Sequence, residues 1–427
     1  MRDALRVALP DDRLITELIV DSFLYVVQAY ENVRALVLGQ TGVEKKSYID
    51  ALVAYARVKR GLPTDDSDRF ARGYVRAYHI EEAIKAYTGN PTIQPFLDRV
   101  DAPGRRATWR QVVSEQILDP LKDEPSDHAI LSMHAFFYRN NHFFTPIDWS
   151  SLKVFNPTAI LTLIDDCYDV VARVNVVREK KGPTTQSNIS LGEALLWRSV
   201  EMSAADLIAN SFGVPHYVLA VKQPIETGYR LLFMPNRLRI YASYPVSSTR
   251  EKPTRVAEIN ENRKVLHHKY AVFDPVSIDE YRAIPPRKKG GKWKHLARWP
   301  IEPIVPCVVA AQDYAPRVWG QLQRLESLIS SQIEERDYRL IDQSEVVVAY
   351  RPFWGGAEYP SQGVEKEIFH AVMTNKQVYY YDPPEDRSDR KKRPFKVIEH
   401  GIRCETKDKL YSELARFQEA RPDESLT

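Results

Sequence analysis

Two acidic residues, Asp337 and Glu367, stand in a stretch of the chain whose pattern places both near one edge of a sheet. Residues 346–349, Val-Val-Val-Ala, form the apolar and mostly β-branched run expected of a strand buried on both faces of a parallel sheet. We expect a helix carrying Asp337 before this strand, and a Pro/Gly-rich loop and a second helix carrying Glu367 after it. Ligands bind beyond the carboxyl ends of such strands, so the sequence predicts that Glu367, one turn into its helix, faces that crevice.

The chemistry suited to these carboxylates is cleavage of the bond between a sugar and a base. Its oxocarbenium-like transition state needs a carboxylate on the sugar face opposite the base, as nucleophile or as ion-pair stabiliser, and we assign that role to Glu367. The departing base needs a proton or a hydrogen bond, which Asp337 can supply. Ser361 and Gly363 begin the Glu367 helix and suit a phosphate group. Taken singly, Glu367 has a plainer interpretation as a surface residue that compensates the helix dipole, and Asp337 as a helix cap.

Three motifs in the C-terminal half extend this pattern. They are Arg336-Asp337 followed by Ser344-Glu345-Val-Val-Val-Ala, then Ser361-x-Gly363-Val364-x-x-Glu367, and an opening strand Leu238-Arg-Ile-Tyr241-Ala-Ser243. Together they resemble the nucleoside 2-deoxyribosyltransferase superfamily, most closely its branch that hydrolyses the N-glycosidic bond of nucleoside 5'-monophosphates. The resemblance covers the chain from Leu238 onward, with Glu345 where the family has Asp. It implies a flavodoxin-like parallel sheet in which Tyr241 orients Glu367, while Ser243, Ser361 and the nearby Arg250 hold a 5'-phosphate.

The N-terminal half contains a loop suited to binding phosphate. A buried strand is expected at residues 35–38, followed by Gly39-Gln-Thr-Gly42-Val-Glu44-Lys45-Lys46-Ser47 and an amphipathic helix over 48–58. In such a loop the backbone N–H groups cradle phosphates, Lys45 neutralises them and Ser47 ligates the Mg²⁺ that accompanies ATP. The spacing resembles the adenylate-kinase-type P-loop, with Glu44 and Lys46 at two of its glycine positions. A working nucleotide site and a degenerate loop kept for structure are both open at this stage.

Other elements of this half follow from their apolar patterns. Arg173 and Lys222 are candidates to face a ligand, and Asp165 and Asp166 are expected to cap a helix. Gly228 and Pro235 mark a linker between two domains, over residues 225–235. Helices are expected at 14–30 and 191–209, and strands at 129–138, 159–164 and 217–221.

Length and composition favour a two-domain protein of the cytoplasm. The 427 residues exceed the usual span of one hydrophobic core, and a net charge of +3 implies no general affinity for nucleic acid or membranes. The three cysteines and the histidines lack metal-ligand spacing, so a reducing compartment and no metal site are expected. No apolar run is long enough to span a bilayer. The basic runs at 282–299, which contains two tryptophans, and at 386–393 are interpreted as solvated loops rather than nucleic-acid sites.

We therefore predict a two-domain α/β protein, with a P-loop kinase-like parallel sheet in residues 1–234 and a deoxyribosyltransferase-like, flavodoxin-like parallel sheet in residues 235–427. The predicted activity is cofactor-free cleavage of the N-glycosidic bond of a nucleotide, by a homo-oligomer whose subunits complete one another's sites. The alternatives are transfer of the sugar to a second base, hydrolysis of NAD, a nucleotide kinase with a ligand-binding C-terminal domain, and a non-enzymatic nucleotide-binding module. A nucleotide sensor joined to a nucleotide-destroying activity would suit a bacterial defence that depletes the nucleotide pool during phage infection.

Overall fold

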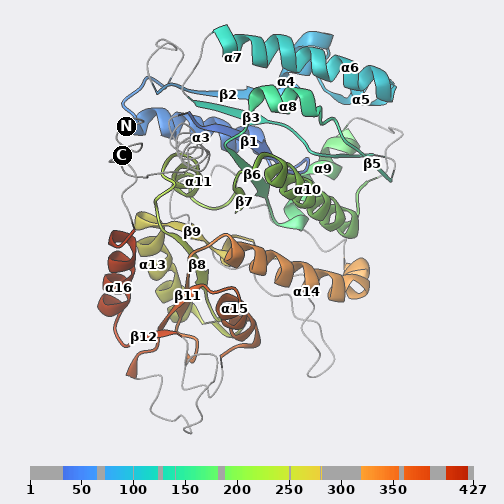
Figure 1. The fold of residues 1–427 in the computed structure, drawn as a ribbon. Helices are drawn as coiled ribbons and strands as arrows, with labels where there is room; N and C mark the ends of the chain where they lie inside the picture. The colour runs from blue at the N-terminus through green and yellow to red at the C-terminus, as the bar shows by residue number, and fades with distance from the viewer. Residues whose placement is uncertain are drawn as a thin grey trace, which may run out of the picture.

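The computed structural model describes residues 32–64, 73–99, 101–123, 128–139, 141–180, 188–249, 252–278, 280, 319–354, 360–384 and 401–421. Four sequence predictions concern segments outside this described part: the helix at 14–30, Arg250, and the basic runs at 282–299 and 386–393. Within it, two five-stranded parallel sheets are each packed against helices, so the chain is an α/β protein (Figure 1).

The first sheet has the strand order β2-β3-β1-β6-β7 and is parallel throughout. Successive residues of β1 serve opposite faces, because Ala35 and Val37 belong to one apolar core and Leu36 and Leu38 to the other. Both faces are therefore apolar, as a parallel sheet covered by helices requires. The strands are β1 (Arg34–Leu38), β2 (Val75–His79), β3 (His128–Ser132), β6 (Ala159–Ile164) and β7 (His216–Ala220).

The single strand predicted at 129–138 is wrong. Strand β3 ends at Ser132, and a separate antiparallel hairpin of β4 (Phe137–Arg139) and β5 (His142–Phe144) follows. The Glu201 carboxylate accepts hydrogen bonds from the N–H groups of Ala135 and Phe136, at 3.0 and 3.2 Å. These two groups thus bond to a distant side chain instead of a neighbouring strand, which takes the backbone out of the sheet.

The linker predicted at 225–235 is also wrong, because most of it forms helix α11 (Ile225–Phe233). This helix packs against α3 (Lys45–Lys59) of the first half and against strand β9 (Ala271–Phe273) of the second. It is a packing element shared by both halves rather than a tether. The remaining helices of the first half are α4 (Ile80–Thr88), α5 (Gln94–Arg99), α6 (Ala102–Val113), η1 (Ser114–Leu118), α7 (Asp119–Asp123), α8 (Trp149–Phe155), α9 (Cys167–Lys180) and α10 (Leu191–Phe212).

The second sheet has the order β12-β11-β10-β8-β9 and is also parallel. Val347 and Ala349 of β10 share a core with α14 and α15, whereas Val346 and Val348 share one with α13 and α16. The predicted strand at 346–349 and the helix beginning beside Ser361 are confirmed. The elements are β8 (Arg239–Ser243), α12 (Val246–Thr249), α13 (Pro253–Lys269), η2 (Pro275–Ser277), α14 (Trp319–Asp342), β10 (Val346–Tyr350), α15 (Gln362–Met373), β11 (Gln377–Tyr381), β12 (Ile402–Cys404) and α16 (Lys407–Glu419).

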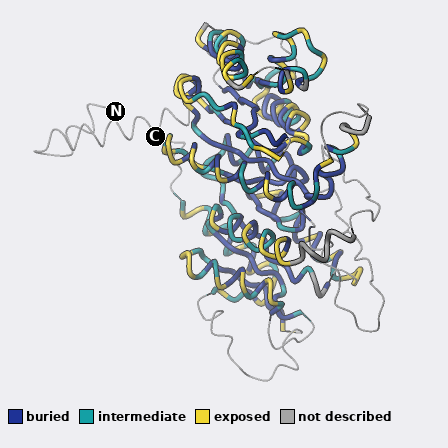
Figure 2. Tube along the Cα trace, turned by 90° about the vertical axis from the view of Figure 1, so that its right-hand side faces the viewer, coloured by how far each residue is buried: buried dark blue, intermediate teal, exposed yellow. Residues whose placement is uncertain are grey.

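The two halves pack directly against one another. One apolar core includes Val218 of β7 and Leu340 of α14, and Figure 2 shows buried segments running through both halves. The Gln343 side chain bonds both the N–H and the C=O group of Val218 at 2.7 Å, which satisfies backbone groups at the edge of the first sheet. Arg339 of α14 donates two hydrogen bonds to Asp206 of α10, at 2.8 and 2.6 Å. Polar and apolar contacts together therefore fix α14 against the first half.

Candidate active site

Glu367 lies on the buried face of helix α15. Val364, Ile368 and Ala371 of this helix are buried, and their spacing of three and four residues defines one helix face. Glu367 falls within the same face, so helix geometry carries its carboxyl group into the interior, where the residue is only 9% exposed. The surface interpretation of Glu367 is therefore wrong.

The neighbours of Glu367 come from strand β8 and helix α14. The Ser243 hydroxyl, at the carboxyl end of β8, donates a hydrogen bond to Oε2 of Glu367. Tyr241 precedes Ser243 by two residues and thus shares its side of the sheet, and its fully buried phenol faces the carboxylates of Glu367 and Asp337. Asp337 is itself buried within α14, so it is not a helix cap. The structure thus brings together Tyr241, Ser243, Asp337 and Glu367.

Arg336 holds Asp337 in place. Its Nε and Nη2 atoms both donate to Oδ1 of Asp337, at 3.0 and 2.8 Å, and Arg336 is only 4% exposed. Nη1 of Arg336 donates to the backbone oxygen of Ile278 and to Oε2 of Glu280, both at 3.3 Å. Asp337 therefore has a buried cation at hydrogen-bond distance, whereas Glu367 receives a neutral hydroxyl.

Burial of two carboxylates together decides the protonation of this site. Burial and then the charge of Asp337 raise the pKa of Glu367 to about 8, against the opposing effect of the Ser243 and Tyr241 hydroxyls and Arg336. Burial also raises the pKa of Asp337, although Arg336 counteracts it. Because the two acids titrate as a pair and the cation lies beside Asp337, the resting pair keeps one proton near neutral pH, mainly on Glu367.

The other predicted residues of this half lie in simpler settings. Ser361 is partly buried at the N-cap of α15, and its side chain makes no capping hydrogen bond. Gly363 is exposed, and a Cβ atom added there would meet no atom within 4 Å. Glu345 precedes β10 and accepts hydrogen bonds from the N–H group of Arg239 and the guanidinium of Arg421. It therefore stabilises the amino ends of the strands, opposite to the ends where Ser243 lies. Glu345, which stands where the resembled family has Asp, thus lies at the opposite end of strand β8 from Ser243 and Glu367.

A wide cavity of about 930 Å³ opens elsewhere, beside α10, α14 and α15. Asp206, His216, Tyr338, Arg339 and His370 are among its lining residues. Glu367, Asp337 and Tyr241 are not among them. This cavity is therefore distinct from the cluster around Glu367.

The Gly39–Ser47 loop adopts a backbone conformation that favours glycine, including at Glu44. Gly39 and Gly42 have φ angles of 146° and 89°, and Glu44 has a left-handed φ of 58°. A side chain in this region costs about 1 kcal/mol or more relative to glycine. Glu44 therefore adopts a left-handed backbone conformation that glycine would adopt without this cost.

Lys45 is turned inward instead of toward a ligand. Its buried Nζ atom donates to the backbone oxygen of Gly39 at 2.6 Å and lies 3.1 Å from the His134 ring, which in turn contacts Glu81 at 2.6 Å. Burial lowers the pKa of Lys45, and the charges of Glu81 and Glu201 oppose that effect. The adjoining cavity has a volume of about 160 Å³, and its lining includes three glutamates, Glu44, Glu81 and Glu82, beside Lys45, Lys46, His79 and His134.

This arrangement does not fit Mg²⁺ with ATP. The cavity is smaller than the roughly 300 Å³ at which small-molecule sites begin. The cationic groups in its lining are already paired, Lys45 with Gly39 and His134, and Lys46 and His79 with Asp50, so they do not offset the three glutamates toward phosphate. Ser47, the predicted Mg²⁺ ligand, is exposed and is not among the lining residues. In the part of the chain that the structure describes, no group of three or more His, Cys, Asp or Glu side chains is placed to hold a metal ion.

Arg173 and Lys222 bond to other protein groups and do not point toward a ligand. Arg173 donates to the backbone oxygen of Gly42 at 2.5 Å and to Asp165 at 2.8 Å. Lys222 is buried and pairs with Asp165, at 2.6 Å, and with Asp169. The prediction that these two cations face a ligand is therefore wrong. Asp166 caps α9 as predicted, because it accepts the N–H group of Tyr168 at 2.9 Å.

Sequence reasoning missed Arg198 and Glu280. Both are buried, and Glu280 binds Arg198 of α10 and Arg336 of α14 at the same time. Glu280 follows η2, and we predicted no helix or strand there that would have given it a position in the fold. Arg198 lies on the buried side of helix α10. Its position among apolar residues at helical spacing is the sequence feature that indicates a buried anionic partner.

A comparison of the chain with models of known protein families, and with curated proteins, finds no match. Among the helices that the structure describes, none is both long enough and apolar enough to cross a lipid bilayer. The function is therefore inferred from the geometry of the site.

Proposed function

We propose that the C-terminal half cleaves the N-glycosidic bond of a nucleotide, a nucleoside 5'-monophosphate or a related compound, through Glu367. The observation that carries the proposal is the buried Glu367 carboxyl group, bonded by Ser243 and faced by Asp337 and Tyr241. Glycosidic cleavage requires two carboxyl groups with different protonation, and a buried pair that shares one proton supports that division of roles.

In the proposed reaction the proton of the pair resides on Asp337 and Glu367 is ionised in the reactive form. The Glu367 carboxylate attacks C1' of the sugar, the C1'–N bond breaks, and the base leaves with the proton of Asp337. Water then hydrolyses the glycosyl ester, which returns a proton to the pair and releases the sugar phosphate. Tyr241 and Ser243 stabilise ionised Glu367, since both of their hydroxyls lower its pKa. Ser361 and Gly363, with the helix N-terminus, are the proposed seat of the 5'-phosphate.

The strand order supports the finer fold assignment. Numbered along the chain, the second sheet has the order 2-1-3-4-5, which is that of flavodoxin-like proteins. In the first sheet, β1 lies between β3 and β6 and leads through the Gly39–Ser47 loop into α3, which supports a P-loop kinase-like unit. We propose domains at 1–234 and 235–427 on this basis, although the two halves share a core. We propose no reaction for the first domain, because its loop does not fit Mg²⁺ with ATP.

The test is incubation with a panel of nucleotides and NAD, followed by chromatography for free bases and for transferred phosphate. Wild-type protein should release a base from at least one nucleotide. Glu367→Gln should abolish that release, and Glu335→Gln, on the exposed side of α14, should not. Base release by Glu367→Gln at the wild-type rate would overturn the proposal. Phosphate transfer that persists in Glu367→Gln and is lost in Lys45→Ala would establish the kinase instead.

A further inference from the structure

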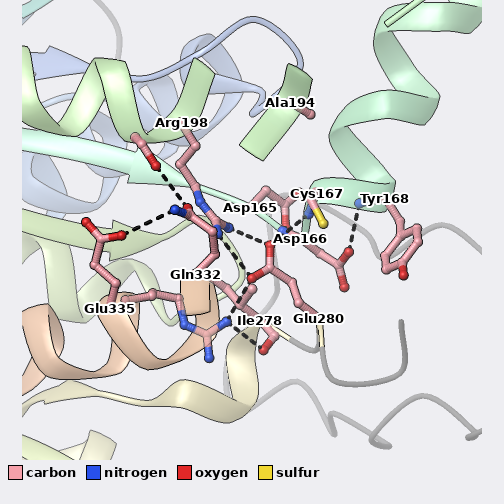
Figure 3. A network of polar contacts seen from close by, with 12 residues as sticks. Asp165, Asp166, Cys167, Tyr168, Ala194, Arg198, Ile278, Glu280, Gln332 and Glu335 are labelled. Carbon is pink, nitrogen blue, oxygen red and sulfur yellow. Dashed lines mark hydrogen bonds and ion pairs between the residues drawn. The ribbon is translucent and has the colours of Figure 1, made fainter. Parts of the chain in front are cut away.

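The site around Asp337 is joined to the first half by a buried ionic network that crosses the interface. Glu280 lies between two arginines: Nη1 and Nη2 of Arg198 donate to its two carboxylate oxygens at 2.5 and 3.2 Å, and Nη1 of Arg336 donates at 3.3 Å. The backbone N–H group of Cys167 also donates to Glu280, at 3.3 Å. Figure 3 shows the Glu280 carboxylate facing Arg198, with Cys167 and Ile278 beside it.

Every charged member of this network is withdrawn from water. Arg198, Glu280 and Arg336 are 2%, 1% and 4% exposed, and Asp337 is 9% exposed. Two arginines and two carboxylates balance one another, so the four residues carry no net charge. Glu367 is an additional acid beside this neutral set, and among the residues that the structure describes no cation lies at hydrogen-bond distance from it. Loss of any one member would leave a buried charge uncompensated.

Arg336 donates hydrogen bonds to two different carboxylates of the network. It directs Nε and Nη2 to Asp337, and Nη1 to Glu280. Arg198 supplies the second cation that Glu280 needs, so Arg336 is not drawn fully onto Glu280. If Arg198 were absent, Glu280 would compete with Asp337 for Arg336, and the charge around Glu367 would become more negative.

We infer that Arg198, a residue of the first half, is a positioning residue for the active site of the second half, acting through Glu280 and Arg336 on Asp337. The role of Arg198 toward an active site rests on the proposed function, whereas the contacts of the network do not depend on it. Arg198 touches neither Asp337 nor Glu367 and takes no part in the reaction. It determines how the Asp337–Glu367 pair shares its proton, and thereby makes the active site depend on the contact between the two halves.

The titratable and charged groups that face Glu367 are Tyr241 of β8 and Arg336, Asp337 and Tyr338 of α14. Arg198 and Glu280 lie one step further away. Their removal should therefore shift the protonation midpoint of Glu367 by roughly one pH unit, less than the largest effects of directly adjacent charges.

The experiment follows the protonated carboxyl of Glu367 by infrared difference spectroscopy across pH, each variant being compared with its own Glu367→Gln derivative. Arg198→Met removes a positive charge and should raise the midpoint. Glu280→Gln removes a negative charge and should lower it. The double variant Arg198→Met/Glu280→Gln restores neutrality and should return the midpoint close to that of wild type, and Arg198→Lys should do the same.

Asp206→Asn is the matched control. It breaks another link between α10 and α14 and removes one negative charge, as Glu280→Gln does, but in a pair that is 26% and 37% exposed. It should leave the midpoint nearly unchanged. Equal shifts in Asp206→Asn and Glu280→Gln, or no shift in either network variant, would overturn the inference.

Two further readouts separate the possible failures. If Arg198→Met does not fold, Glu280→Gln still carries the test, because an unshifted midpoint in that variant refutes the inference. The charge-neutral double variant and Arg198→Lys then check that the shift in Glu280→Gln arises from the uncompensated charge. The infrared titration requires no substrate, so absence of base release by wild-type protein refutes the proposed function and leaves the inference to be decided by the spectra. Where base is released, the alkaline limb of kcat/KM, at which the acid pair loses its one proton, should move in the same directions as the spectra.

Discussion

The replacement of Glu367 by Gln should make the protein more stable at neutral pH, although it removes the residue proposed to be catalytic. In the folded protein the pKa of Glu367 is raised from its ordinary 4.5 to about 8. Between these values the unfolded chain releases the proton and the folded chain retains it, so the folded state loses stability as the pH rises from 4.5 toward 8. Gln carries no proton to release, and its side-chain oxygen can still accept the Ser243 hydroxyl.

The gain in the free energy of unfolding follows from the difference between the pH and the pKa of Glu367 in the unfolded chain. At pH 7 that difference is about 2.5 units, and each unit corresponds to about 1.4 kcal/mol, so Glu367→Gln should gain about 3.5 kcal/mol in the free energy of unfolding. At pH 5 the gain should be below about 1 kcal/mol, because the pH is then only half a unit above the pKa of Glu367 in the unfolded chain.

Urea unfolding at pH 5 and pH 7, followed by circular dichroism, measures both values. Glu335→Gln removes an exposed carboxyl from α14 and serves as the control, with an expected change within about 0.5 kcal/mol at either pH. A loss of stability in Glu367→Gln at pH 7, or an equal gain at both pH values, would refute the electrostatic account of the site. A large pH-dependent gain would show that a carboxylate is kept in an unfavourable place, as functional sites often require.

Four other substitutions test separate parts of the structure. Glu44→Gly should raise the free energy of unfolding by about 1 kcal/mol, because it relieves a left-handed residue, and should strengthen the thermal stabilisation by inorganic phosphate; an unchanged response to phosphate would mean that the loop is purely structural. Gly39→Ala should destabilise by about 3 kcal/mol in urea unfolding, since its Cβ would lie 2.5 Å from the Leu163 oxygen, whereas Gly363→Ala, in open space, should be neutral or stabilising. Tyr241→Phe removes a hydroxyl that lowers the pKa of Glu367, so the alkaline limb of kcat/KM, where the acid pair loses its last proton, should move to higher pH; a shift to lower pH would contradict the assigned contact.

The unit from β10 to β11 could be predicted from the sequence because its pattern is local. The run at 346–349 has the composition of a doubly buried strand, and the spacing of Val364, Ile368 and Ala371 defines a helix face without reference to other segments. The same spacing places Glu367 on that face. A candidate acid at a buried helix position was therefore available from the sequence, as was the Ser243 strand beside it.

The failures share a physical cause, which is a partner distant in the sequence. Strand β3 ends early because Glu201 of α10 takes the N–H groups that would have continued it. Arg173 and Lys222 have the charge expected of phosphate ligands, but Asp165 occupies both of them. Local pattern shows that a residue is charged and on which face it lies. It does not show whether a buried opposite charge has already been supplied by another segment.

The division of roles between Asp337 and Glu367 illustrates the same limit within the site. The sequence supplies two acids in the right order, and the chemistry alone assigns the proton to Asp337, the donor to the base. The structure places Arg336 on Asp337, which leaves the resting proton mainly on Glu367 and requires its transfer before the proposed attack. Arg336 is adjacent to Asp337 in the chain, yet its orientation depends on Glu280, and Glu280 depends on Arg198 of the other half. The protonation of the proposed nucleophile is thus a property of the interface between the halves, and neither half read separately could have revealed it.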